Sequence, residues 1–304
     1  MKIFKKIVLT FLAVILVSLI GGYLYFEQKF TPEENYLTLK DESGKIPIKW
    51  MGSDKNVLLL PVRFSKDSVT YYMQFDTGSP STVFYSNAIK GIKGIEIKND
   101  RAKSSLTIGN TKIISDKFII FDKGNNSTNV DAVKIIGTLG ADILEDKKTL
   151  INFKDNYVEF NILKQPVEFT SRLLDFKFKK RKIILEGFLN GKKDKFLYDS
   201  GTSAYEFLTN KEIWEVLKAP NSKVIIRKEQ SWKNILTSYT TKSKNFIFFS
   251  DSKVPVNEIT YVEDFSKSQY LMMKFSGMTG MLGNKIFMKN SIYIDCTQNK
   301  IGIQ

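Results

Sequence analysis

Two short segments of this chain carry an aspartate in the same four-residue pattern, Asp76-Thr77-Gly78-Ser79 and Asp199-Ser200-Gly201-Thr202. Each aspartate ends an apolar run, so its carboxylate is expected to emerge from the floor of a hydrophobic core. Each glycine permits a turn that is too tight for a Cβ atom and lets another backbone approach closely. If the two loops meet, their carboxylates can share one proton and serve as a general acid and a general base. Taken singly, either segment is also typical of a polar turn after a strand.

The composition excludes several other kinds of chemistry. The 304 residues include no histidine, which excludes Ser-His-Asp and Cys-His catalysis as well as histidine-ligated zinc. The single cysteine, Cys296, excludes an internal disulfide, a cysteine zinc site and an ordinary iron–sulfur site. If the chain is an enzyme, its chemistry must therefore come from carboxylates, hydroxyls, lysines or a cofactor.

The elements that position the two aspartates are duplicated in the sequence. Val57–Phe64 and Val69–Phe75 predict a β-hairpin that ends at the first aspartate, and Ile183–Leu189 and Lys195–Tyr198 predict one that ends at the second. The two aspartates are 199 − 76 = 123 residues apart, and the two hairpin turns coincide at that offset.

The duplication continues downstream, where Thr138-Leu139-Gly140 resembles Met281-Leu282-Gly283 at an offset of 283 − 140 = 143 residues. Each Leu-Gly segment is followed by a predicted strand, a tight turn and a second strand. These strands are Leu150–Phe153 and Tyr157–Phe160 in the first copy, and Ser291–Cys296 and Lys300–Ile303 in the second. Strand–turn–strand patterns over Leu106–Asp122 and Ile247–Asp264 also match.

We therefore predict a mainly β chain in three parts: an anchor over residues 1–30, a first half over 31–165 and a second half over 166–304. Each half carries one aspartate loop. A helix is predicted over Thr209–Leu217, because Thr209 and Glu212 have the spacing of a capping box.

With two such loops and two Leu-Gly strands in this order, the chain resembles the pepsin-like aspartic peptidases over most of residues 50–304. The resemblance implies two pseudo-symmetric, β-barrel-like lobes that meet at Asp76 and Asp199, which would be the catalytic pair. It implies a peptide or protein substrate and a reaction that uses no metal and no cofactor, and we expect a monomer.

The resemblance also implies roles for the neighbours of the two aspartates. Thr77 and Ser200 correspond to hydroxyls that brace one loop against the other. Ser79 and Thr202 correspond to outer hydroxyls that hydrogen-bond the carboxylates. In this family a hydrophobic strand passes beside each loop. The matching strands here end in Leu139-Gly140 and Leu282-Gly283. Gly78 and Gly201 are the glycines of the two loops.

One departure from the family leaves a second function open. The first lobe of these enzymes carries a hairpin with a tyrosine that closes over the substrate, but no tyrosine lies between Ala88 and Val133. The alternative to a membrane-anchored aspartic endopeptidase is therefore a weakly active or inactive relative that binds peptides or serves as a scaffold. The retention of both aspartates favours the enzyme.

The amino terminus predicts a membrane anchor. Lys2, Lys5 and Lys6 precede an uncharged stretch over Ile7–Phe26, which has 26 − 7 + 1 = 20 residues and can cross roughly 30 Å of hydrocarbon. The alternative is a cleaved signal peptide, but no small-residue cleavage site follows the stretch. The net charge of +14 is scattered along the chain without a nucleic-acid-binding motif, so we expect no nucleic-acid partner.

Because basic residues flank the span on its amino-terminal side, we predict a single-pass protein with a cytoplasmic amino terminus and an extracytoplasmic carboxyl terminus. A protease added to intact cells should remove a tag fused after Gln304. Protection of that tag until the cells are permeabilised would contradict this orientation.

Overall fold

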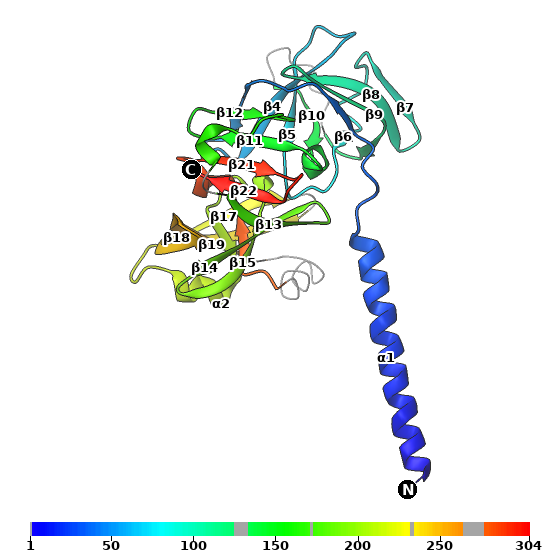
Figure 1. Ribbon diagram of the computed structural model, residues 1–304, viewed down its shortest axis with the longest axis vertical. Coiled ribbons are helices and arrows are strands. Elements are labelled where there is room, and N and C mark those ends of the chain that lie inside the picture. The colour runs from blue at the N-terminus through cyan, green and yellow to red at the C-terminus, as the bar shows by residue number, and fades with distance from the viewer. Residues whose placement is uncertain (1, 125–132, 171–172, 232–233, 264–276) are drawn as a thin grey trace. The chain divides into compact units, whose positions relative to one another are not determined.

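The computed structural model describes residues 2–124, 133–170, 173–231, 234–263 and 277–304. The chain forms two compact units, Met1–Glu34 and Asn35–Gln304. The first is the helix α1 (Lys2–Phe30), and the second is mainly β (Figure 1).

The helix α1 is long and apolar enough to cross a membrane. Its Ile3–Phe30 segment has 28 residues, with a mean hydropathy of 2.6 in its most apolar window. At the rise of an α-helix this segment is about 42 Å long, which exceeds the roughly 30 Å hydrocarbon core of a bilayer. The helix predicted from Ile7–Phe26 is therefore confirmed.

In the described part of the first half, six strands pair into a closed, barrel-like ring. In order around the ring they are β4 (Val57–Phe64), β5 (Tyr71–Phe75), β10 (Ile135–Leu139), β6 (Val83–Tyr85), β9 (Thr111–Phe121) and β8 (Arg101–Ile108), which pairs again with β4. The β5–β10 and β6–β9 pairs are parallel. Three further strands extend the ring: β1 (Thr38–Lys40) along β9, β3 (Lys49–Met51) along β4, and β7 (Ile95–Lys98) along β8.

The described strands of the second half form a ring with the same order and the same parallel pairs. They are β14 (Lys182–Leu189), β15 (Lys192–Tyr198), β20 (Gly280–Leu282), β16 (Phe207–Thr209), β19 (Ser252–Glu263) and β18 (Asn234–Phe249), which pairs again with β14. The strand β17 (Ile225–Ser231) lies along β18. Both hairpins predicted to end at an aspartate are confirmed, as β4–β5 and β14–β15.

Strands from both halves join in a third set of pairings. In order they are β2 (Ile46–Pro47), β12 (Tyr157–Glu159), β11 (Lys148–Asn152), β21 (Ser291–Asp295), β22 (Lys300–Ile303) and β13 (Leu173–Lys179). At its centre Leu150 of β11 lies opposite Tyr293 of β21. These two residues are 293 − 150 = 143 positions apart, the offset of the repeat, so equivalent residues of the two copies face each other. The halves are therefore related by a local two-fold axis here.

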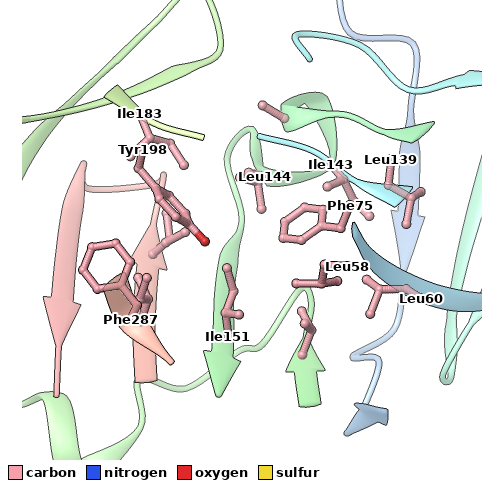
Figure 2. Close-up of a cluster of buried hydrophobic side chains, with 14 of the residues drawn as sticks. Leu58, Leu60, Phe75, Leu139, Ile143, Leu144, Ile151, Ile183, Tyr198 and Phe287 are labelled. Atoms are coloured by element: carbon pink, nitrogen blue, oxygen red, sulfur yellow. The ribbon is translucent and has the colours of Figure 1, made fainter. Parts of the chain in front are cut away.

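The apolar core continues from one half into the other. Figure 2 shows Phe75, at the end of β5, among Leu58, Ile143 and Leu144, and Tyr198, at the end of β15, near Phe287. The rings of Tyr198 and Phe287 meet edge to face with centroids 5.7 Å apart. The residue before each aspartate is therefore fixed in packed apolar side chains.

Two smaller predictions have different outcomes. Cys296 is buried beside the final hairpin, as its alternation with apolar residues predicts. The helix start was wrong: α2 (Lys211–Leu217) is capped by Asn210, whose side chain accepts a hydrogen bond from the N–H of Ile213. Thr209 instead ends β16, where its hydroxyl donates to the carbonyl of Thr279, so tertiary pairing overrides its capping propensity.

Candidate active site

Each aspartate is placed by the end of one strand and by a second strand threaded beside it. Asp76 follows β5, which pairs in parallel with β10, and its N–H donates to the carbonyl of Leu139 at 3.0 Å. Asp199 follows β15, which pairs in parallel with β20, and its N–H donates to the carbonyl of Leu282 at 2.9 Å. The structure therefore places each predicted Leu-Gly strand, β10 or β20, beside the aspartate loop of the same half.

The glycines after these leucines permit the close threading. A Cβ atom on Gly140 would lie 2.4 Å from the carbonyl carbon of Ser81, and one on Gly283 would lie 2.1 Å from the carbonyl oxygen of Thr202. Neither distance is possible for real atoms, and both neighbours are backbone, so any larger residue would push the strand away from the loop.

Thr77 and Ser200 join the two loops with four hydrogen bonds. The N–H of Thr77 donates to the Ser200 hydroxyl at 2.9 Å, and the N–H of Ser200 donates to the Thr77 hydroxyl at 2.9 Å. Each hydroxyl then donates to the residue before the opposite aspartate: Ser200 to the carbonyl of Phe75 at 2.9 Å, and Thr77 to that of Tyr198 at 3.2 Å. Thr77 is 0% exposed and Ser200 is 1% exposed, so these bonds do not compete with water. We call these four bonds the loop clasp.

The loop clasp makes each carboxylate face the glycine of the opposite loop. A Cβ atom on Gly78 would lie 2.6 Å from the carboxyl oxygens of Asp199, and one on Gly201 would lie 2.4 Å from Oδ1 of Asp76. Each carboxyl group also affects the pKa of the other, so the two lie close together. Gly78 and Gly201 are therefore needed for the pair to form.

Backbone N–H groups hold each carboxylate in place. Oδ1 of Asp76 accepts from Gly78 at 2.9 Å and from Ser79 at 3.2 Å, and Oδ1 of Asp199 accepts from Gly201 at 2.8 Å. The side chains of the fourth loop residues differ from the expectation. The Ser79 hydroxyl donates to the carbonyl of Ser81, and the Thr202 hydroxyl donates to the carbonyl of Asp199, so both stabilise the turns rather than the carboxylates.

The surroundings raise the pKa of both carboxyl groups, with burial as the largest cause. For Asp199 the negative charge of Asp76 is the next cause, and its pKa is raised to about 7. The N–H groups of Gly78 and Ser79 oppose the effect of burial at Asp76. The two carboxyl groups act on one another, so they titrate as a pair, and the charge of Lys123 favours ionisation at Asp76.

Sequence reasoning missed Tyr85 and Lys123, which lie near Asp76. The Tyr85 hydroxyl is 2.7 Å from that of Thr138, and the ammonium of Lys123 lies 5.0 Å from the centre of the Tyr85 ring. The Lys123 charge lowers the pKa of Asp76. Burial raises the pKa of Tyr85, and the charge of Asp76 adds to the rise. Only their positions in the folded chain reveal these residues.

Arg181 also escaped the sequence reasoning. Its side chain is 5% exposed and reaches from the second half to the first. There Nε lies 3.1 Å from a carboxylate oxygen of Glu145, and Nη1 donates to the carbonyl of Pro80 at 3.3 Å. Pro80 directly follows the first loop. The Arg181 charge also acts on Asp142, which binds Thr82; burial raises the pKa of Asp142 to about 6. Through the Arg181–Pro80 hydrogen bond, this network holds the end of the first loop against the second half.

Among the described residues, no cluster of three or more carboxylate or thiol side chains could hold a metal ion. A scan of protein-family models finds no match to this chain, and a search of curated proteins finds no significant match.

Loss of the loop clasp should destabilise the fold. Thr77→Val or Ser200→Ala leaves buried N–H and carbonyl groups unpaired, so each should lower the free energy of unfolding by about 1–3 kcal/mol in urea titrations. The double variant should lose less than the sum by at least about 0.5 kcal/mol, because the hydroxyls share one set of bonds. Thr107→Val, on the outer surface of β8, is the matched control. Additive losses no larger than that of the control would contradict the clasp.

Asp199 should make the fold less stable as the pH rises. Between about pH 4 and pH 7 the folded protein holds a proton on Asp199 that the unfolded chain releases. The unfolded state then binds fewer protons, so the free energy of unfolding falls with increasing pH. Asp199→Asn cannot titrate, and its free energy of unfolding should fall less over this range. Parallel stability curves for the two proteins would contradict the raised pKa.

Proposed function

We propose that this chain is an aspartic endopeptidase that hydrolyses peptide bonds with a water molecule activated between Asp76 and Asp199. One observation carries the proposal: two equivalent loops from the two halves are joined by hydrogen bonds and place each carboxyl group against the glycine of the opposite loop, around a local two-fold relation. On this proposal the two strand rings are the pseudo-symmetric lobes of a pepsin-like fold.

The charge of Lys123, which favours the ionised form of Asp76, supports a division of roles. The ionised Asp76 would take a proton from the water as its oxygen attacks the carbonyl carbon of the substrate. Asp199, which keeps the shared proton, would donate it to the carbonyl oxygen, so that a neutral gem-diol forms. Neither step needs a covalent intermediate. Two carboxyl groups that share one proton are a general property of aspartic proteases, so this feature of the pair is typical of the whole class.

The helix α1 supports attachment to a membrane. We propose a single-pass anchor with Lys2, Lys5 and Lys6 on the cytoplasmic side and residues 35–304 on the opposite side.

A peptide-binding protein without turnover is the second candidate. The observation that favours it is the β7–β8 hairpin, which follows the first loop in the chain and turns at Asn99 and Asp100. Its strands contain no aromatic residue, so it offers no tyrosine to close over a substrate.

The test is turnover of a peptide library by the purified full chain from pH 3 to 7. Activity should follow a bell-shaped profile on the acid side of neutrality and should resist chelators and serine-directed reagents. Asp76→Asn and Asp199→Asn should each reduce the rate by at least about 10²–10⁴-fold, and the double variant should lose little more, because the pair acts as a unit.

Asp116→Asn is the matched control, since Asp116 is exposed on β9. Near-normal activity in Asp76→Asn would contradict the proposal. Peptide binding by the wild type without any cleavage would favour the second candidate.

A further inference from the structure

The outer surface of the second half carries three exposed phenylalanines on neighbouring strands. Phe188 of β14 is 47% exposed, and Phe246 and Phe248 of β18 are 37% and 42% exposed. Phe188 lies directly opposite Phe248 across the β14–β18 pair. Directly opposed residues share one face of a sheet, so these rings form one apolar patch in contact with solvent.

Lysines border this patch on both sides. Lys253 of β19 lies opposite Phe248, and Lys193 of β15 lies opposite Phe188. The ammonium of Lys253 is 3.8 Å from the centre of the Phe246 ring. We call these five residues, together with Lys195, the aromatic–basic face. Glu186, the acidic side chain within it, is neutralised by ion pairs with Lys177 and Lys193.

The duplicated fold shows that the phenylalanines are not required by the sheet. The β4–β8 pair of the first half matches the β14–β18 pair, and there Arg63 lies opposite Thr107, where the second half has Phe188 opposite Phe248. Ser105 is the counterpart of Phe246, because Ser105 precedes Thr107 by two residues and Phe246 precedes Phe248 by two residues.

The next pair inward is apolar in both halves: Phe64 with Leu106, and Leu189 with Ile247, all buried. The two halves therefore agree in the apolar residues that face the core, and they differ in the residues that face solvent, which are aromatic in the second half.

We propose that the aromatic–basic face docks onto the surface of an anionic lipid membrane. Phenylalanine rings enter the headgroup boundary, and lysines beside them are attracted to anionic lipids. A second copy of the chain does not suit this face, because each copy has a net charge of +14 and would bring lysines against lysines.

Docking of this face uses the proposed membrane anchor, which would hold the β unit near a bilayer. The helix α1 ends at Phe30 and β1 begins at Thr38, and the intervening 31–37 segment extends to at most roughly 25 Å. The face lies away from the aspartates: Lys193 precedes Asp199 by 199 − 193 = 6 residues along β15, or about 20 Å of strand. Docking would therefore leave the carboxyl pair uncovered, and it does not depend on the proposed peptidase activity.

The test places the full chain in nanodiscs of phosphatidylcholine, with or without about one third phosphatidylglycerol. Phe248→Trp and its first-half counterpart Thr107→Trp are compared, each after subtraction of the wild-type signal, using lipids with brominated acyl chains that quench indole fluorescence. In the anionic discs Phe248→Trp should be quenched at least about twice as strongly as Thr107→Trp, because only an inserted ring meets the acyl chains. Lys193→Gln and Lys253→Gln together, or high salt, should reduce this quenching to the level in neutral discs.

Three outcomes would overturn the proposal. Equal quenching of the two variants in anionic discs would show that the face does not contact lipid. Equal quenching of Phe248→Trp in neutral and anionic discs would contradict recognition by charge. Exposure of this site to aqueous acrylamide in both kinds of disc would show that the ring stays in water and would contradict docking onto lipid. Both substitutions are at surface positions, and far-ultraviolet circular dichroism checks that each variant is folded.

Discussion

Thr77 and Ser200 each use one hydroxyl to accept a hydrogen bond from the other's backbone and to donate one to the residue before the opposite aspartate. Because the four groups are buried, breaking any one of these bonds leaves a polar group without water. The two halves therefore have one low-energy alignment at this point. The chain enters each loop from a packed aromatic residue, Phe75 or Tyr198, so the core and the loop clasp fix the same position.

The electrostatics of the site follow from this alignment. Two carboxyl groups held in contact and largely away from water cannot both ionise at low free-energy cost, so one keeps a proton. The two loops are equivalent in backbone but not in surroundings. The charge of Lys123 acts on Asp76, whereas for Asp199 the charge of Asp76 is the largest cause of the raised pKa after burial. The two equivalent loops thus hold two carboxyl groups with different surroundings. Such a difference is required if one group is to act as an acid and the other as a base.

The sequence predicted the parts of this arrangement that the repeat encodes. The hairpins that end at Asp76 and Asp199, and the Leu-Gly strands beside them, follow from local patterns that occur twice in the same order. Arg181 and Tyr85 could not be predicted, because their roles depend on contacts between segments far apart in the chain; Arg181 reaches Pro80, 101 residues away. The roles that the family resemblance implied for the hydroxyls of Ser79 and Thr202 were wrong, because both hydroxyls donate to nearby carbonyls. The repeat further shows where the halves differ, since the surface of β14 and β18 is aromatic while that of β4 and β8 is polar.

The central claim is that Asp76 and Asp199 titrate as one coupled pair, and carbon-13 NMR of aspartate side-chain carboxyl carbons tests it most directly. Asp76→Asn and Asp199→Asn assign the two resonances by their loss. In the wild type the pair should titrate in two well-separated steps, with the upper step near neutral pH, and removal of either aspartate should shift the titration of the other. Two independent midpoints near the ordinary value of 3.8, unchanged by removal of the partner, would contradict the coupling.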